Sequence, residues 1–208
     1  MTTRRNLLAH LGAAAVGAIG ISAWAGTPQR QAGTPSGGGR AHTFPNPTLL
    51  THEGKEVRFY DDLIRGKIVV INMMYAQCSD RCPPMTQNLR RVQDMLGNRI
   101  GRDIHMYSMT LLPEQDRPQD LKDYARLHGV KPGWTFLTGR PDDIEGIRKR
   151  LGFYERDANL DADITRHTGM LRIGNEALDR WCTSAALGAP RLIVDAIKAV
   201  TPHSHRIA

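Results

Sequence analysis

The stretches IVVINMM, residues 68–74, and CSDRCPP, residues 78–84, follow each other closely and decide the fold. A nearly continuous apolar run of this length is typical of a strand buried on both faces. Proline is accepted in the first turn of a helix, because its missing N–H would be unpaired there anyway. Pro83 also pushes Cys82 away from the helical region. The sequence therefore predicts a strand that leads into a helix, with Cys78 and Cys82 at or just before the helix N-terminus.

Helix and strand patterns alternate through the rest of the chain. Apolar residues at helical spacing, with proline near a start or glycine after an end, predict helices at 87–96, 118–128, 142–151 and 191–200. Strand patterns cover 104–110 and 134–137, and two hairpins are predicted, one over 49–60 and one over 170–182 around Gly174-Asn175. The order predicts an α/β protein with a central mixed sheet flanked by helices on both faces. A thioredoxin-like fold with an N-terminal β-hairpin fits this order.

The first 43 residues have the composition of a targeting segment and a linker. Arg4-Arg5 opens an apolar stretch that closes with Ala23-Trp24-Ala25, so residues 1–25 are predicted to be a twin-arginine-type signal. An uncleaved membrane anchor is the alternative. Residues 26–43 are rich in Gly, Pro, Ser and Thr and are predicted to be a flexible linker. We therefore expect a periplasmic domain over 44–200, with a tail at 201–208.

The charge balance is basic, at +7 for the whole chain. Removal of residues 1–25 would leave +5, since that segment holds two arginines and no acidic residue. The remaining excess is spread along the chain, without a long basic run interleaved with aromatic residues. This pattern gives no support for nucleic-acid binding, and it is typical of a solvated basic face that helps docking to an acidic partner or an anionic membrane.

Cys78 and Cys82 are the first candidates for chemistry. The chain has three cysteines, so at least one thiol is unpaired in the monomer, although export places the protein in an oxidising compartment. A helix N-terminus favours thiolate, which binds soft metals and attacks disulfides. The polar residues between the two cysteines predict that both thiols are exposed. The pair therefore indicates metal binding or thiol–disulfide exchange.

Other candidate ligands carry weaker signals. His167 precedes the apolar residues 170–173, and a histidine at such a junction could project beside the cysteine loop. Cys182 is expected to be a buried small residue, with a disulfide to Cys78 or Cys82 as the alternative. The remaining soft or imidazole donors are expected to be core side chains or part of a solvated tail: Met73, Met74, His203 and His205.

The motif C-x-x-x-C-P after a buried strand, with D-x-x-x-H far downstream, resembles the Sco/SenC family of copper proteins. Residues 108–118 and 133–139 also resemble family segments, and the resemblance runs from about residue 44 to 200. It implies a thioredoxin-like fold that holds copper, as Cu(I) and also Cu(II), through Cys78, Cys82 and His167. Thiolates favour Cu(I), and imidazole suits both oxidation states.

The chain departs from the family pattern at four places. Ser79 stands where proline often follows the first cysteine, Arg166 precedes the histidine where aspartate is usual, and Thr110 replaces an aspartate. Residues 173–176 replace the usual turn after the histidine. The chain thus resembles a divergent member of the family.

The resemblance implies an exported copper chaperone rather than an enzyme. It would deliver copper to, or prepare the thiols of, a respiratory copper enzyme such as cytochrome c oxidase, or another cuproprotein. A thiol reductant would be a second partner. The alternative is a periplasmic thiol–disulfide oxidoreductase in which Cys78 attacks and Cys82 resolves the mixed disulfide. A peroxide-reducing relative, with sulfenate formed at Cys78, is a third interpretation without a supporting pattern.

Overall fold

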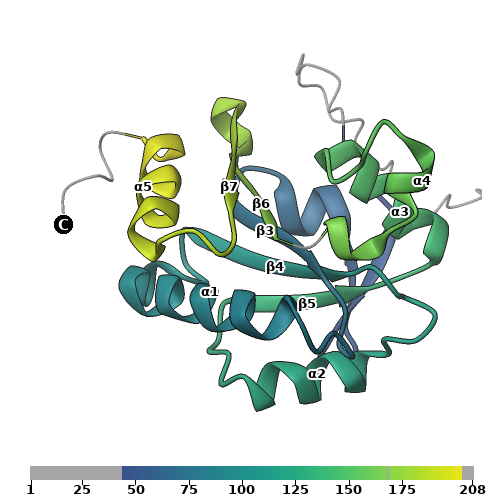
Figure 1. Ribbon diagram of the computed structural model, residues 1–208. Helices are drawn as coiled ribbons and strands as arrows, with labels where there is room; N and C mark the ends of the chain where they lie inside the picture. Colours follow the sequence, from purple (N-terminus) through teal and green to yellow (C-terminus); the bar gives the residue numbers. More distant parts are fainter. Residues whose placement is uncertain (1–43, 168, 203–208) are drawn as a thin grey trace, which may run out of the picture. The chain divides into compact units, whose positions relative to one another are not determined.

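A mixed sheet of seven strands organises the protein, for which a computed structural model describes residues 44–167 and 169–202. The strand order is β2-β1-β5-β4-β3-β6-β7, and Figure 1 labels the strands from β5 to β7 of this order. The strands are β1 (Thr48–Thr51), β2 (Glu56–Arg58), β3 (Ile68–Met74), β4 (Ile104–Thr110), β5 (Trp134–Thr138), β6 (Met170–Asn175) and β7 (Arg180–Ala185). β3 runs parallel to β4 and antiparallel to β6, with Ile68 opposite both Ile104 and Asn175. The expectation of a mixed α/β sheet is confirmed.

All seven residues of β3 are buried, because helices cover both faces of the sheet. One core contains apolar side chains of α1 (Cys82–Leu96), α2 (Pro118–Leu127) and α5 (Pro190–Val200). The other contains those of η1 (Phe59–Ile64) and α3 (Pro141–Leu151). Full burial of one such side chain contributes about 1.5–3 kcal/mol, so the two cores supply most of the force that holds the layers together.

Proline begins each of the four long helices, within the first two positions of α1, α2, α3 and α5. Its fixed φ suits the first turn, where no N–H is needed. Gly97 and Gly152 end α1 and α3 with φ of 54° and 84°, a conformation that glycine adopts without strain. These local signals explain why the predicted helices lie close to those observed.

Two local expectations were wrong, and two short helices were not predicted. Phe59 and Tyr60, predicted as the end of a strand, begin the helical segment η1, in which Phe59, Tyr60, Leu63 and Ile64 are all buried in one core. The C-terminal hairpin turns at η4 (Glu176–Leu178) and Asp179, rather than at Gly174-Asn175. The backbone of Asp179 takes a left-handed φ of 50° at that turn. The short helices α4 (Ala158–Asp161) and η3 (Ile164–His167) had no periodic signal.

The predicted signal and linker, residues 1–43, lie outside the described residues, as do His203 and His205. Within residues 44–167 and 169–202, no helix has the length and apolar character to span a membrane.

Candidate functional site

The two thiols of the C-x-x-x-C-P motif meet where the loop after β3 enters α1. The backbone N–H of Cys78 donates to the carbonyl of Tyr75 at 3.2 Å, which curls the loop back on itself. The backbone N–H of Cys82 then donates to Sγ of Cys78 at 3.3 Å. Cys82 is the first residue of α1, and Arg81 at the N-cap provides no side-chain cap. The Cys78 sulfur therefore accepts from the start of the helix, where a negative charge is favoured.

Both thiols are buried, so the expectation of exposed cysteines was wrong. Cys78 is 7% exposed and Cys82 is fully buried, in the same core as Met74 and Met85. The polar residues between the cysteines face solvent, but the side chains of the cysteines turn inward because α1 begins at Cys82. The sulfurs therefore lie in a largely apolar shell that excludes water and suits a soft ligand.

The environment separates the pKa values of the two thiols. Burial alone would raise the pKa of Cys78, but hydrogen bonds from the Cys82 thiol and backbone, from Tyr75 and from the backbone of Asp80 together lower it. Burial raises the pKa of Cys82 to about 12, with a further contribution from its hydrogen bond to Cys78. The hydrogen bond to Cys78 raises the pKa of Tyr75 to about 12. Cys78 is therefore the thiolate-forming member of the pair, and Cys82 holds a proton.

A buried carboxylate, Asp116, supports the cysteine loop and was not expected as a site residue. Its Oδ2 atom accepts from the backbone N–H of Ala76 at 2.9 Å and from the hydroxyl of Thr110 at 2.5 Å. Asp116 is 1% exposed, and its charge is one of the lesser causes that raise the pKa of Cys82. It ties the end of β4 to the loop that carries Cys78. The only sequence signal for it was its place in the family-like segment 108–118.

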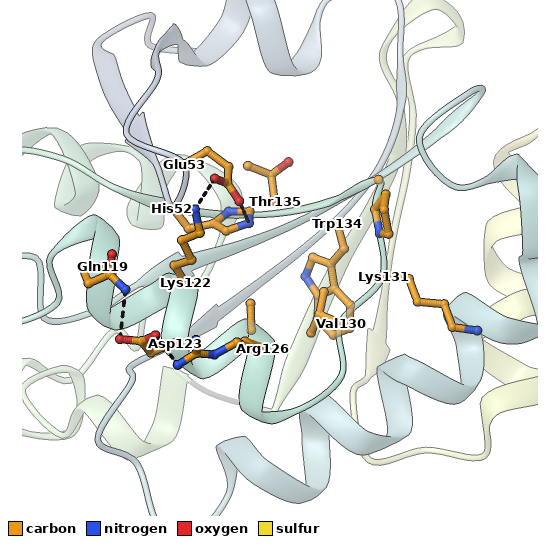
Figure 2. A pocket seen from close by; sticks show the side chains of 13 residues that line it. His52, Glu53, Gln119, Lys122, Asp123, Arg126, Val130, Lys131, Trp134 and Thr135 are labelled. Atoms are coloured by element: carbon orange, nitrogen blue, oxygen red, sulfur yellow. Dashed lines mark hydrogen bonds and ion pairs between the residues drawn. The ribbon is translucent and has the colours of Figure 1, made fainter.

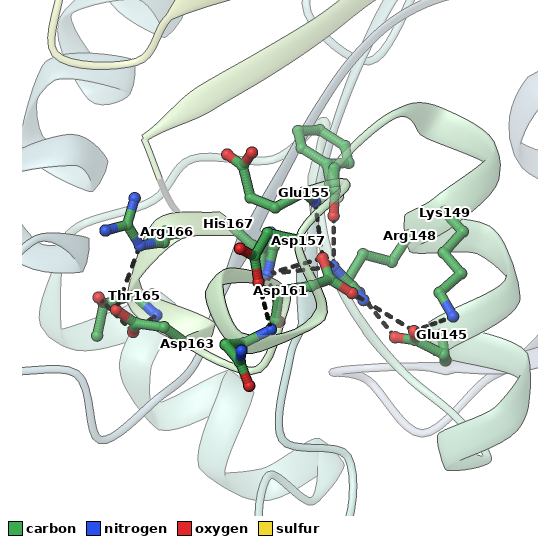
Figure 3. Close-up of polar contacts among 12 residues, drawn as sticks. Glu145, Arg148, Lys149, Glu155, Asp157, Asp161, Asp163, Thr165, Arg166 and His167 are labelled. Atoms are coloured by element: carbon green, nitrogen blue, oxygen red, sulfur yellow. Dashed lines mark hydrogen bonds and ion pairs between the residues drawn. The ribbon is translucent and has the colours of Figure 1, made fainter.

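His167 is also buried, but its ring faces a different set of groups. Its Nε2 atom lies 2.8 Å from the backbone carbonyl oxygen of Asp161 and 3.2 Å from Nη1 of Arg148 (Figure 3). Oδ1 of Asp161 lies 3.4 Å from the same nitrogen. The ring is 4% exposed and ends the segment η3. The His167 imidazole, which was predicted to be the third copper ligand, therefore contacts Asp161 and Arg148 in this structure.

Arg148 organises this second cluster from the last turns of α3. Its guanidinium forms a fork to Glu145 at 2.7 and 2.8 Å and another to Asp161 at 2.9 and 2.7 Å (Figure 3). A further hydrogen bond reaches the carbonyl of Phe153 at 2.6 Å. Arg148 is 5% exposed. Two forks on a buried guanidinium neutralise its charge and fix the chain around His167.

The structure brings Cys78 and Cys82 together and keeps His167 in the Arg148 cluster. Among the described residues, no three His, Cys, Asp or Glu side chains are arranged to hold a metal ion. A hydrogen bond joins the two regions, from Nη1 of Arg81 to the carbonyl of Thr165 at 3.4 Å. The donor chemistry of the two sulfurs fits Cu(I), while a site with three ligands needs the imidazole to leave its present partners.

The other candidate donors lie away from the cysteine pair or within the cores. Cys182 is a half-buried free thiol whose Sγ atom lies 4.0 Å from the carbonyl oxygen of Ala196. Cys78 and Cys82 are also free thiols, so Cys182 forms no disulfide with either of them here. Met73 and Met74 are fully buried, one in each core, as expected.

A hollow of about 560 Å³ lies between α2, β5 and the loop after β1, and no cysteine lines it (Figure 2). Its charged groups are already paired, Lys122 with Glu53 at 2.6 Å and Arg126 with Asp123 at 2.9 Å. Nδ1 of His52 accepts the N–H of Phe136 at 3.1 Å, and burial lowers the pKa of this histidine. The hollow is separate from the cysteine site.

Comparison with known proteins identifies the family. The model of the SCO1/SenC family matches residues 38–199. The chain belongs to the SCO1/SenC family. Among curated relatives, it is 29% identical to the SCO1 protein homolog of Bacillus subtilis over 93 residues, which is 44% of this chain and 47% of the relative. It is 28% identical to the protein sco1 of Schizosaccharomyces pombe over 107 residues, 51% of this chain and 39% of the relative. The match thus spans less than half the length of each of these relatives.

Solved structures of SCO1/SenC proteins share the fold. A family lipoprotein from Bacillus anthracis has a TM-score of 0.60 at 21% identity, covering 76% of this chain and 94% of that one. Yeast Sco1 with copper bound has a TM-score of 0.59 at 18% identity, covering 81% and 100%. These likenesses confirm the expected thioredoxin-like architecture of the SCO1/SenC domain.

Proposed function

We propose that this SCO1/SenC protein is an exported copper chaperone that binds Cu(I) through Cys78, Cys82 and His167. The observation that carries the proposal is the 3.3 Å contact between the Cys82 N–H and the Cys78 sulfur at the start of α1. It gives one readily ionised sulfur beside a second sulfur in an apolar shell, which suits a soft monovalent cation. The copper-bound relatives add support from the same fold.

The copper acceptor in this proposal is a respiratory copper enzyme such as cytochrome c oxidase, in the periplasm. One relative of solved structure, BsSco, is a member of the Sco family of cytochrome c oxidase assembly proteins. Three donors from this chain leave a coordination position for a group of the acceptor, so copper could pass without being released to solvent. An N-terminal anchor or signal would bring the domain to the membrane side where such enzymes lie.

A Cu(I) titration of the reduced protein against a competing chelator tests the proposal. Cys78→Ala and Cys82→Ala are each expected to lower the affinity at least about 100-fold, because a single thiolate cannot replace two soft donors. His167→Ala is expected to lower it at least about 10-fold, because the loss of even an outer-shell partner of a metal ligand costs about 10- to 100-fold. Cys182→Ala is the matched control and should leave the affinity unchanged. Equal affinity in Cys82→Ala and Cys182→Ala would refute the copper site.

Thiol–disulfide exchange is the second candidate function, and the unequal pKa values of the thiols favour it. The Cys78 thiolate would attack a disulfide sulfur of the partner and form a mixed disulfide, and the departing partner sulfur would take a proton. Cys82, after losing its proton, would attack the Cys78 sulfur and release the second partner thiol. The products are a Cys78–Cys82 disulfide and a reduced partner, and a thiol reductant would restore the pair. Unchanged exchange rates in His167→Ala, with copper affinity that is weak in every variant, would favour this function.

A further inference from the structure

A basic and aromatic surface, separate from the cysteine site, surrounds a hollow of about 980 Å³ at the end of α3. Four cations line the hollow, namely Lys149, Arg150, Arg156 and Arg172. Only two acidic residues line it, and one of them, Asp161, is already held by both arms of the Arg148 fork. We call these four cations, together with Phe44, Tyr154 and Trp181, the basic–aromatic surface. The basic–aromatic surface therefore has a net positive charge, because its lining contains more cations than acidic residues.

Three arginines of this surface have no ionic partner in the part of the chain that the structure describes. Within residues 44–167 and 169–202, no ion pair is formed by Arg150, Arg156 or Arg172. Nε of Arg172 is buried and has no hydrogen-bond partner among these residues. In natural proteins a buried polar atom without a partner calls for an explanation, such as a bound ion or ligand. Arg150 and Arg156 are both exposed, so their unpaired charges are open to an external anion.

Aromatic rings lie among these cations. Trp181 lies over Gly174, where an added Cβ would be 2.1 Å from the indole, and packs against Phe44 with ring centroids 5.0 Å apart. The Arg172 guanidinium lies 5.6 Å from the Trp181 ring, and that of Arg150 lies 5.6 Å from the Phe44 ring. Tyr154, on the rim of the hollow, is 51% exposed. Arginine beside aromatic rings that are partly or fully exposed is the composition found at membrane interfaces, where rings lie at the headgroup level.

The chain enters the described domain at this surface, because Phe44 is part of it and residues 1–43 precede it. Those residues hold four arginines and not one acidic side chain, so they cannot neutralise the surface themselves. They also include the apolar stretch that is expected to direct the protein to a membrane. A second copy of the chain is an unfavourable occupant as well, since it would present the same positive charge.

We propose that the basic–aromatic surface docks on an anionic phospholipid membrane. The arginines pair with lipid phosphates and Tyr154 enters the headgroup layer, while the cysteine site on the α1 side of β3 stays clear for a partner. The proposal is independent of copper, because none of the residues that carry it is a proposed ligand.

Vesicle binding of the chain from Ala41 to Ala208 tests the proposal. This segment is a separate unit that contains the complete sheet and both described cores, so it can be expected to fold without the preceding residues. We expect it to bind vesicles of mixed phosphatidylcholine and phosphatidylglycerol, with loss of binding in high salt, and to ignore pure phosphatidylcholine. The half-buried Trp181 should report docking by a blue shift of its emission.

Two double variants, each of which removes two positive charges, test whether vesicle binding depends on this surface or only on the total charge of the protein. Each cation near an anionic membrane raises the partition coefficient about fivefold, so R150Q/R156Q should lower it about 25-fold. R91Q/R191Q, on the exposed sides of α1 and α5, should lower it less than about threefold. Equal losses in the two variants, or no preference for anionic vesicles, would overturn the proposal and would leave an acidic protein as the alternative partner. Copper affinity should be unchanged in both variants, so failure here is distinguishable from failure of the chaperone function.

Discussion

Nη1 of Arg148 lies 3.2 Å from Nε2 of His167, while the same imidazole nitrogen lies 2.8 Å from the carbonyl oxygen of Asp161. A guanidinium only donates and a carbonyl only accepts, so Nε2 satisfies one of them at a time. The shorter distance favours Nε2–H donating to the carbonyl. A proton on Nε2 leaves that nitrogen without a lone pair for copper. In this arrangement the Nε2 atom of His167 is directed at the Asp161 carbonyl and is not free to bind metal.

Copper binding through Nε2 should consequently disturb Arg148, although that residue is no proposed ligand. In the metal-free protein the guanidinium N–H groups are buried and bonded, so their NMR signals should be sharp and slow to exchange. We expect addition of one equivalent of Cu(I) to shift these signals and speed their exchange. His167→Ala should abolish the effect of copper on them. Unshifted Arg148 signals together with a strong His167 effect on affinity would mean that copper binds while the ring keeps its present contacts.

Arg148→Ala should destabilise the fold strongly. It leaves the carboxylates of Asp161 and Glu145 without their forked partner and opens a space beneath the 153–167 segment. Removal of one member of a buried ion pair typically costs about 3–5 kcal/mol. Since Glu145 is partly exposed, we expect about 3 kcal/mol in the free energy of unfolding, measured with urea. Lys149→Ala, which removes an exposed partner of the same Glu145, is the control and should cost less than about 1 kcal/mol.

The same cluster predicts a loss of stability in acid. Hydrogen bonds from Arg148 lower the pKa of Asp161 and that of Glu145. A carboxylate with a depressed folded-state pKa contributes stability that is present above its ordinary value and is lost as the pH falls below it. The urea midpoint should therefore fall as the pH drops below about 4, near the ordinary carboxyl range. Asp161→Asn should flatten this dependence, whereas Asp195→Asn on the exposed side of α5 should leave its slope unchanged.

The two thiols should titrate far apart in the reduced, metal-free protein. Ultraviolet absorbance of thiolate should show one group ionising below the ordinary thiol value of 9.0, and Cys78→Ser should remove that step. Cys82→Ala should move the pKa of Cys78 upward, because the Cys82 thiol no longer donates to it. Cys182→Ser is the control and should leave the first step in place. A first step that survives in Cys78→Ser would assign the low pKa to another residue.

Asp116→Asn tests the support of the cysteine loop. The substitution keeps the shape of the side chain but weakens the charge-assisted hydrogen bonds from Ala76 and Thr110. We expect a loss of about 1–3 kcal/mol in the free energy of unfolding. The pKa of Cys82 should also fall, because a nearby negative charge is removed. Asp123→Asn on the exposed face of α2 should change neither quantity; if the two variants behave alike, Asp116 has no special role in the loop.

The sequence by itself determined the elements that depend on local signals. The apolar run 68–74 produced β3 with the predicted bounds, and Pro83-Pro84 marked the start of α1, although Cys82 is the first helical residue rather than lying outside the helical region as expected. These succeed because strand burial and helix initiation depend on residues close together in the chain. The cysteine pair was likewise identified from spacing alone, and the residues around it carried the family resemblance.

Tertiary structure alone decided where the side chains point. The burial of the thiols depends on how α1 packs against β3 and α5, and the partners of His167 depend on Arg148, nineteen positions earlier in the chain. Arg148 lies in a run of three basic residues that is typical of an exposed face, yet it is the one turned inward. Such contacts between distant residues leave no periodic trace in the sequence, because the free energy that sets them arises only when α3 and the 153–167 segment come together.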